Sequence, residues 1–322
     1  MEMLQTIKHL AVGNCFARVA VALILSTSLM AQDQKQSESQ LRVVPRVFGT
    51  KQPDLARSPN DRVWLDEAGN LVVEGARRRG AEAITIAITR RVHVRPIVNC
   101  SVRSGPDGFT YEYRITNAPD AKQWIQIFWL DALGPIGAAR APEYWRVYNI
   151  ERSKPPLERV FFGRDALDSD TNRRLTPGAS QDGFVVQSQA RPGLVRLFFV
   201  GHKPLPGESG YIADEAILES SEVEMSDWLR QEANKYLSME ANSVVLTGIG
   251  PKYPPSVPAV QALRNELLEA VRNPVFLPDR DAINSLLSTG QDRTSLQSGI
   301  ESLLKKATGI RAELYAALIR HY

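Results

Sequence analysis

The hydrophobic pattern of the chain changes period near residue 220, and this change limits the possible folds more than any other feature. Between residues 62 and 217, short apolar runs alternate with turn residues, and in the run FTYEYRIT the apolar side chains recur at every second position. This spacing gives each strand one face directed to a core. Many short strands without long helices between them are typical of an antiparallel sandwich or barrel and argue against a parallel α/β sheet.

After residue 220 the apolar residues recur at the spacing of a helix. The segment 226–239 carries Trp228, Leu229, Tyr236 and Leu237, and the strand-like run SVVLTGIG and the proline-rich run PKYPPSVP follow it. Beyond Pro258, four successive apolar stripes predict short amphipathic helices. The fold class that we predict is therefore an antiparallel β-sandwich followed by a small α-helical C-terminal bundle.

The N-terminal residues have the pattern of an export signal. Lys8 and Arg18 precede the apolar run VAVALIL, and Ala31 is a small residue suited to a cleavage point. The run is too short to span a bilayer, so we expect no transmembrane span after cleavage, although an uncleaved anchor is the alternative. An extracytoplasmic location, periplasmic or secreted, follows from this interpretation.

These patterns predict the following domain boundaries. Residues 1–31 are a signal peptide, residues 32–60 a flexible leader, residues 61–250 a β-sandwich domain with an appended helix, residues 251–258 a proline-rich linker, and residues 259–322 a helical bundle.

Charge is close to balanced overall but uneven along the chain. The formal net charge is only +3, which argues against a polycation built for nucleic acid. Residues 77–103 contain seven arginines and one acid, whereas residues 208–227 contain seven acids and no Lys or Arg. We expect either that the acidic connector lies over the basic strands or that each segment is an ordinary solvated face; the alternative is a basic surface for an anionic polymer or a lipid headgroup.

Motifs for catalysis and for metal binding are incomplete. His93, His202 and His321 are the histidines outside the predicted signal, and GESGY lacks the second glycine of a nucleophile elbow. No HExxH or CxxC motif occurs. The calcium-like start at residues 168–172 continues with Arg173 and Ala179 where a calcium loop requires Gly and Glu. We therefore predict no metal, no cofactor and no enzymatic activity, with an enzyme of unfamiliar type as one alternative.

Cysteine adds a single further expectation. Cys15 lies in the predicted signal, which leaves Cys100 without an internal disulfide partner. We expect Cys100 to be a buried thiol on a strand. A reactive thiol would need a cationic neighbour, for which Arg95 and Arg103 are the candidates in the sequence.

The strand over residues 123–130 is apolar on both faces. Trp124, Phe128 and Leu130 alternate with Ile125, Ile127 and Trp129. One face belongs to the sandwich core, so the other must be covered by the helical region or form an exposed platform for a ligand. In the second case the neighbouring aromatics would extend a sugar-stacking surface. The candidate ligand-binding residues are Trp124, Trp129, Tyr144, Trp145 and Tyr148.

Three short runs, FTYEYRITN, LTPGASQDGF and ARPGLVRLFFVG, resemble segments of immunoglobulin-like sandwich modules of exported bacterial proteins. The residues that carry the resemblance are Tyr111, Tyr113, Asn117, Leu175, Pro177, Gly178 and Ser180. It covers about a third of the chain and implies a fold and a compartment, but no active-site residues.

Our functional expectation is an exported, non-catalytic binding or structural protein of unknown ligand, whose partner would be a protein or polysaccharide at the cell surface and not nucleic acid. The second alternative is a carbohydrate-binding accessory module that uses exposed aromatics.

Overall fold

The structure is a computed structural model that describes residues 58–79, 83–154, 157–164, 174–202, 215–220, 222–290 and 292–322. The chain divides into two compact units, Met1–Pro53 and Asp54–Tyr322, and all described residues belong to the second. The predicted signal peptide, most of the leader, the calcium-like run up to Arg173 and the GESGY run lie outside the described residues.

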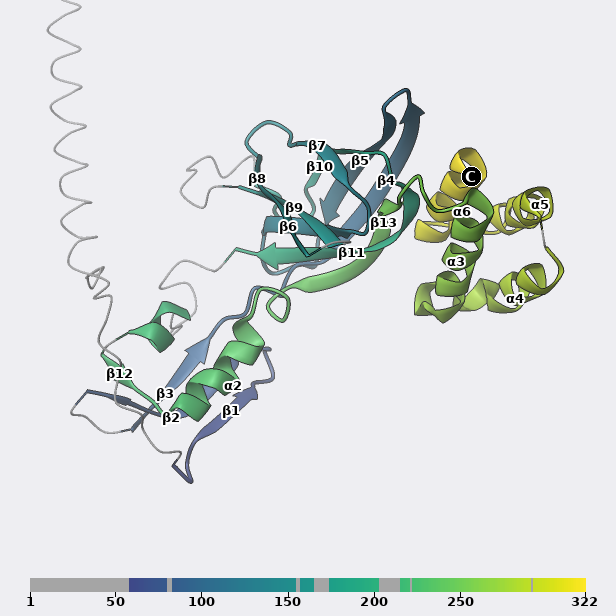
Figure 1. The fold of residues 1–322 in the computed structure, drawn as a ribbon. Helices are drawn as coiled ribbons and strands as arrows, with labels where there is room; N and C mark the ends of the chain where they lie inside the picture. The colour runs from purple at the N-terminus through teal and green to yellow at the C-terminus, as the bar shows by residue number, and fades with distance from the viewer. Residues whose placement is uncertain are drawn as a thin grey trace, which may run out of the picture. The chain divides into compact units, whose positions relative to one another are not determined.

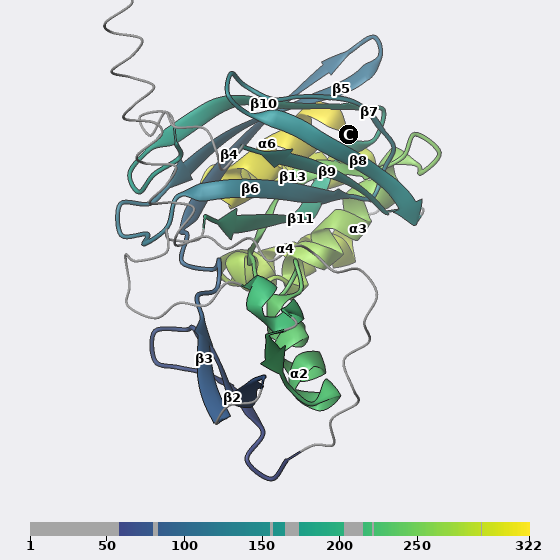
Figure 2. The ribbon, with the colours of Figure 1, turned by 90° about the vertical axis from the view of Figure 1, so that its left-hand side faces the viewer.

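Two antiparallel sheets form the β-sandwich (Figure 1, Figure 2). One sheet has the strand order β4 (Pro96–Gly105), β5 (Gly108–Asn117), β10 (Ser180–Ser188), β7 (Ile136–Arg140). The other has the order β13 (Val244–Tyr253), β11 (Arg191–Gly201), β6 (Ile125–Ala132), β9 (Leu157–Gly163), β8 (Arg146–Lys154). The predicted antiparallel sandwich is therefore present.

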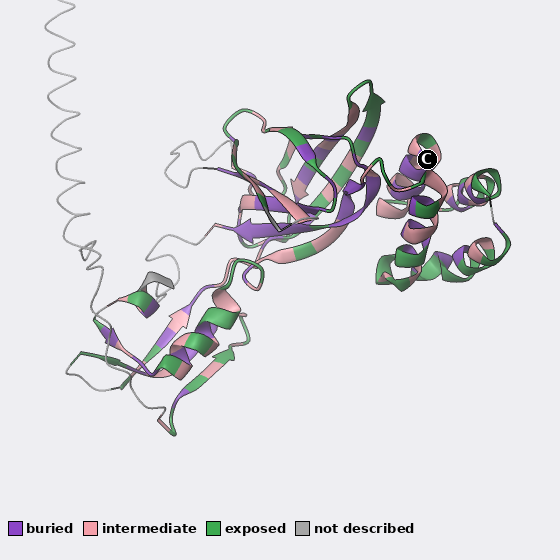
Figure 3. Cartoon of the chain, in the orientation of Figure 1, coloured by how far each residue is buried: buried purple, intermediate pink, exposed green. Residues whose placement is uncertain are grey.

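Aromatic side chains fill the space between the two sheets. On β5, Tyr111, Tyr113 and Ile115 are buried at every second position, and the alternation along this strand is visible in Figure 3. From the facing sheet, Phe128 stacks on Phe162 at 4.7 Å between ring centroids. The two tyrosine hydroxyls donate hydrogen bonds to the backbone carbonyls of Ala190, at 2.6 Å, and Ile249, at 2.9 Å. Because buried hydroxyls are satisfied in this way, the core tolerates tyrosine at both positions.

The C-terminal helices cover one side of the sandwich. They are α3 (Ala259–Arg272), the short 3₁₀ helix η3 (Pro274–Asp279), α4 (Arg280–Thr289), α5 (Arg293–Leu304) and α6 (Ile310–His321). Their buried side chains, including Leu263, Leu314 and Leu318, belong to the same apolar cluster as the sandwich core. The bundle and the sandwich therefore share one core.

Polar side chains of this bundle bind the edge strands of both sheets. The Glu313 carboxylate accepts hydrogen bonds from the Cys100 backbone N–H at 3.1 Å and from the Asn99 amide at 2.8 Å, and the His321 imidazole lies 3.2 Å from the Val102 carbonyl. On the other sheet, the Asn273 amide donates to the Thr247 hydroxyl at 3.1 Å. An exposed strand edge otherwise presents unpaired backbone groups to other chains. The bundle therefore occupies a backbone N–H group at the edge of β4 and contacts a side chain of β13.

A buried ion pair lies where α3 meets the sandwich. Lys252 and Glu266 are 5% and 0% exposed as side chains, and their charged atoms are 2.9 Å apart. Glu269 contacts the same ammonium, while the Tyr253 hydroxyl and the Leu194 backbone N–H donate to Glu266. Burial raises the pKa of Glu266, and the nearby Lys252 opposes that shift. Every charge in this network therefore has partners.

We expect Glu266→Gln to lower the free energy of unfolding by about 2 kcal/mol, because it removes charge-assisted hydrogen bonds to a buried ammonium. The matched control is Glu269→Gln, which alters the half-exposed partner and should cost less. Urea unfolding at neutral pH measures the free energy of unfolding of both variants. If wild type and Glu266→Gln were equally stable, the ion pair would make no net contribution to the free energy of unfolding.

The first three strands form a sheet of their own and are not part of the sandwich. Strand β2 (Leu71–Arg78) pairs with β1 (Arg62–Leu65), β3 (Ala83–Ile88) and β12 (Val223–Glu224). Helix α2 (Asp227–Leu237) buries Leu229 and Ala233 against this sheet. A further 3₁₀ helix, η2 (Glu215–Glu219), precedes β12. The sandwich domain expected over residues 61–250 thus contains a separate small α/β layer, and the Trp228 helix packs on that layer.

Residues 222–224 of the acidic connector lie beside the basic strand β2. Glu224 of β12 is opposite Arg77 of β2, and the Arg79 backbone N–H donates to the Glu222 carbonyl at 3.0 Å. The side chains of Arg77, Arg78 and Arg79 remain exposed.

Candidate functional site

Two of the five candidate ligand-binding aromatics are buried. Trp145 is 5% exposed and packs edge-on against Phe184 in the sandwich core. Trp129 is 0% exposed and stands on the outer face of the five-stranded sheet between two stacked rings, those of Phe198 at 4.7 Å and Phe161 at 5.5 Å. Neither indole has a free face on which a sugar could stack. Both faces of β6 are apolar, as expected. Trp129 packs in a small cluster with Ile127, Phe161, Phe198 and Val200, and this cluster includes no residue of α2 or of the terminal bundle.

The other three candidates lie toward one end of the five-stranded sheet. Trp124 precedes β6 and stacks on His202 at 4.5 Å. Tyr148 is 50% exposed, and its ring fills the space above Gly163, the last residue of β9. Tyr144 is 40% exposed and has a positive φ of 69°. Ligand binding by these three residues stays a prediction.

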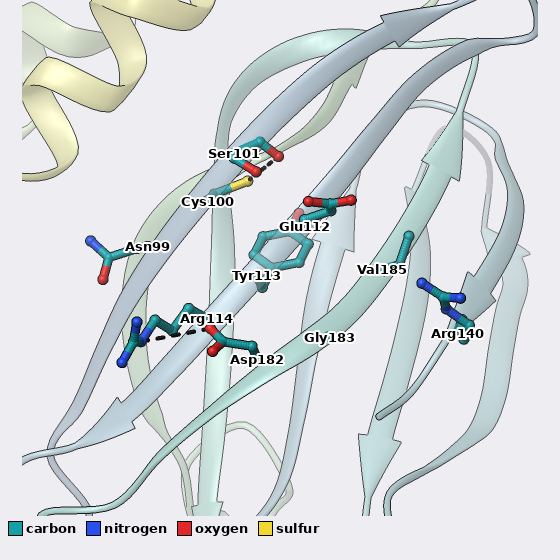
Figure 4. Close-up of a pocket in the computed structure, with 10 residues that line it drawn as sticks. All are labelled: Asn99, Cys100, Ser101, Glu112, Tyr113, Arg114, Arg140, Asp182, Gly183 and Val185. Carbon is teal, nitrogen blue, oxygen red and sulfur yellow. Dashed lines mark hydrogen bonds and ion pairs between the residues drawn. The ribbon is translucent and has the colours of Figure 1, made fainter. Parts of the chain in front are cut away.

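A shallow depression lies on the outer face of the four-stranded sheet (Figure 4). Its volume is about 430 Å³, and polar side chains from all four strands line it. They stand at the positions that alternate with the buried aromatics, because neighbouring residues of a strand point to opposite faces. The lining side chains used below are Asn99, Ser101, Glu112, Arg114, Arg140, Asp182 and Val185.

Four of these residues form a row across the sheet. Ser101 of β4 is opposite Glu112 of β5, Glu112 is opposite Val185 of β10, and Val185 is opposite Arg140 of β7. Adjacent strands are about 4.8 Å apart, so Glu112 and Arg140 are separated by about 10 Å of backbone. Val185 is buried between them and forms the floor. The row therefore holds a carboxylate and a guanidinium on either side of an apolar centre.

A β-bulge shapes one side of the depression. Asp182 and Gly183 are both inserted opposite Arg114, where the pairing of β10 with β5 shifts register. Gly183 has a φ of 93°, in the left-handed region that glycine adopts readily. Bulges of this kind redirect side chains at binding surfaces. Here the bulge places the Asp182 carboxylate 3.6 Å from the Arg114 guanidinium.

The charges on this face do not cancel completely. Glu112 is paired with Arg103 at 2.9 Å, and Asp182 with Arg114. Arg140 is exposed, and within the part of the chain that the structure describes it forms no ion pair. The depression therefore combines hydrogen-bonding groups of both signs with one surplus positive charge.

Cys100 lies on β4 and lines the depression, and it is half-buried rather than buried as expected from the sequence. Burial raises the pKa of its thiol well above the usual range, and the Glu313 carboxylate adds to the shift. A cationic neighbour would have the opposite effect.

We expect the Cys100 thiol to react with iodoacetamide at pH 8 much more slowly in the folded protein than in urea, because the thiolate is scarce in the fold. Mass spectrometry of timed samples measures the difference. Equal rates in the two states would contradict the assignment of an inert thiol.

Sequence reasoning overlooked this depression, although part of the signal was present. The residues Thr110, Glu112, Arg114 and Thr116 occupy the polar positions of the same period-two run that marks the core. They indicate a hydrated face with charged groups opposite the aromatic one.

The described residues include neither a membrane-spanning helix nor a metal-binding cluster. Among the helices described, none combines the length and the apolar composition of a membrane span. Within those ranges, no group of three or more His, Cys, Asp or Glu side chains is arranged to hold a metal ion.

Comparison with known proteins gives little. No family model matches the sequence, and no curated protein matches it. Among solved structures, the chain is similar to a cohesin module from the Clostridium perfringens ATCC13124 family 33 glycoside hydrolase. The TM-score is 0.20 at 8% identity, over 33% of this chain and 80% of the cohesin chain. A likeness at this level carries no argument about function.

Proposed function

We propose that this chain is an exported, non-catalytic binding protein of the extracytoplasmic space, built on an immunoglobulin-like sandwich. Its ligand-contact surface is the outer face of the four-stranded sheet around the depression. The observation that supports the proposal is the row Ser101–Glu112–Val185–Arg140, which presents polar groups from three strands around the buried Val185 of β10.

The depression lies on a packed core. Behind it, the aromatic core fixes the strands, and at its rim Arg103 and Arg114 form exposed ion pairs with Glu112 and Asp182. Binding to a preorganised surface avoids the entropy that ordering loops would cost. Polar groups on a rigid sheet are therefore suited to binding a ligand without catalysing a reaction.

The proposal is tested by affinity electrophoresis of the full chain in native gels that contain soluble polysaccharides, neutral and acidic. We expect retardation by at least one polysaccharide. Ser101→Arg, which fills the depression, should abolish it without changing the melting temperature. The matched control is Ser302→Arg, an exposed serine on α5. Mobility that no polysaccharide changes, or retardation that Ser101→Arg leaves intact, would refute this surface.

A second candidate surface is supported by the two exposed tyrosines near Gly163. Tyr148 and Tyr144 keep half or nearly half of their surface in solvent, and aromatic faces stack on sugars. This is the carbohydrate-binding alternative with a smaller aromatic set. Tyr148→Ala should abolish retardation if the alternative holds, whereas Ser101→Arg should not.

The export part of the proposal has its own prediction. We expect the mature protein to begin at Gln32, because Ala31 follows the apolar run and precedes a polar stretch. N-terminal sequencing of the protein recovered from the periplasm or medium measures this. Recovery of the chain with Met1 or Met3 intact would contradict cleavage.

A further inference from the structure

The surplus charge on the four-stranded sheet indicates the chemistry of the ligand. Arg103 and Arg114 are occupied by Glu112 and Asp182, at 2.9 and 3.6 Å. Arg140 is at the other end of the row, two strands from Glu112, and forms no ion pair with any described residue. A guanidinium in this position can bind a carboxylate through two parallel hydrogen bonds.

We infer that the depression binds a saccharide that carries a carboxylate, with Arg140 as the residue that binds this carboxylate. The inference rests on the proposed function and names the ligand class for the same surface. The carboxylated sugar could belong to a polysaccharide or be free in solution, and both present the same group to Arg140.

The rest of the row suits the remainder of such a ligand. Ser101, Asn99 and the carboxylates of Glu112 and Asp182 offer donors and acceptors for hydroxyl groups. The distance of about 10 Å between the backbones of Glu112 and Arg140 leaves room for about one sugar ring over Val185. A single ring can then place hydroxyls at Glu112 and its carboxylate at Arg140.

The same face is less suited to a protein or a nucleic acid. Protein interfaces depend on buried aromatic or large apolar anchors, and the lining side chains of the depression include no exposed aromatic residue, since Tyr113 is buried. A nucleic-acid backbone carries a negative charge on every phosphate, whereas this face has one surplus positive charge with which to bind it. A sugar ring with several hydroxyl groups and one carboxylate matches both the acids and the surplus arginine.

The test is isothermal titration of the full chain with trigalacturonate and with the neutral sugar galactotriose. We expect trigalacturonate to bind at least about tenfold more tightly, the size of effect that a charge-assisted hydrogen bond provides. Arg140→Gln should reduce its affinity to that of the neutral sugar, Arg140→Lys should restore part of it, and added salt should weaken it. Arg293→Gln, an exposed arginine of α5, is the matched control.

The outcomes separate this inference from the proposed function. Equal binding of both sugars, abolished by Ser101→Arg but not by Arg140→Gln, would overturn the inference and leave the binding surface intact. Binding of trigalacturonate that neither variant changes would overturn both. Absence of binding by trigalacturonate would overturn the inference, and the polysaccharide gels would then decide the proposed function independently.

Discussion

Deleting residues 259–322 is expected to leave a chain that no longer unfolds cooperatively. The deletion exposes the core residues that the bundle covers and removes both carboxylates that neutralise the buried ammonium of Lys252. Burial of one large apolar side chain contributes about 1.5–3 kcal/mol to the free energy of unfolding. The sum over several such side chains exceeds the free energy of unfolding of a typical domain, which is about 5–15 kcal/mol. The buried residues lost with the bundle include Leu263, Leu267, Phe276, Leu314, Tyr315, Leu318 and Tyr322.

Thermal unfolding followed by near-ultraviolet circular dichroism measures this effect. The control is Glu313→Gln, which weakens the contact with the β4 edge while retaining the bundle, and it should still unfold cooperatively at a somewhat lower temperature. A truncated chain that melts like the full chain would show that sandwich and bundle are independent domains.

Trp129→Ala should lower the free energy of unfolding by about 3–5 kcal/mol, as expected for a fully buried large aromatic residue. The substitution leaves a cavity between the rings of Phe161 and Phe198. The control is Tyr148→Ala on the same sheet, which removes a half-exposed ring and should cost less than about 1.5 kcal/mol.

Urea unfolding of both variants decides the role of Trp129. Unchanged stability of Trp129→Ala together with loss of polysaccharide retardation would mean that this face is a ligand platform. In that case the candidate set proposed from the sequence would regain Trp129.

The hydrophobic period predicted the strands, but it could not predict which strands share a sheet. Residues 71–78 alternate as the sandwich strands do, yet β2 pairs with β1, β3 and β12 and is covered by α2. Side-chain alternation indicates that a strand has one buried face. It does not indicate which element packs on that face, because that depends on residues distant in sequence. The apolar faces predict that the Trp228 helix or the terminal bundle packs on the sandwich; the bundle does so, whereas the Trp228 helix packs on the small sheet.

The candidate site was hidden for a related reason. Strand β7 has the sequence IGAAR, in which small residues give no hydrophobic period, so Arg140 could not be assigned to a strand. Its neighbour Glu112 belongs to a clear period-two run, but only the register of β5, β10 and β7 places the two charges in one row. In contrast, the uneven charge of the sequence allowed the acidic connector to lie near the basic strands, and Val223–Glu224 of that connector pairs with β2.

The contact between the bundle and the β4 edge affects how copies of this chain can assemble through that strand. A second chain could pair with β4 at Cys100 only by displacing the Glu313 carboxylate from the backbone N–H. Strands β7 and β8 are the edge strands of the sandwich on the side away from β4 and β13. Strand addition at β7 or β8 would leave the Glu313 contact intact, whereas strand addition at β4 would break it.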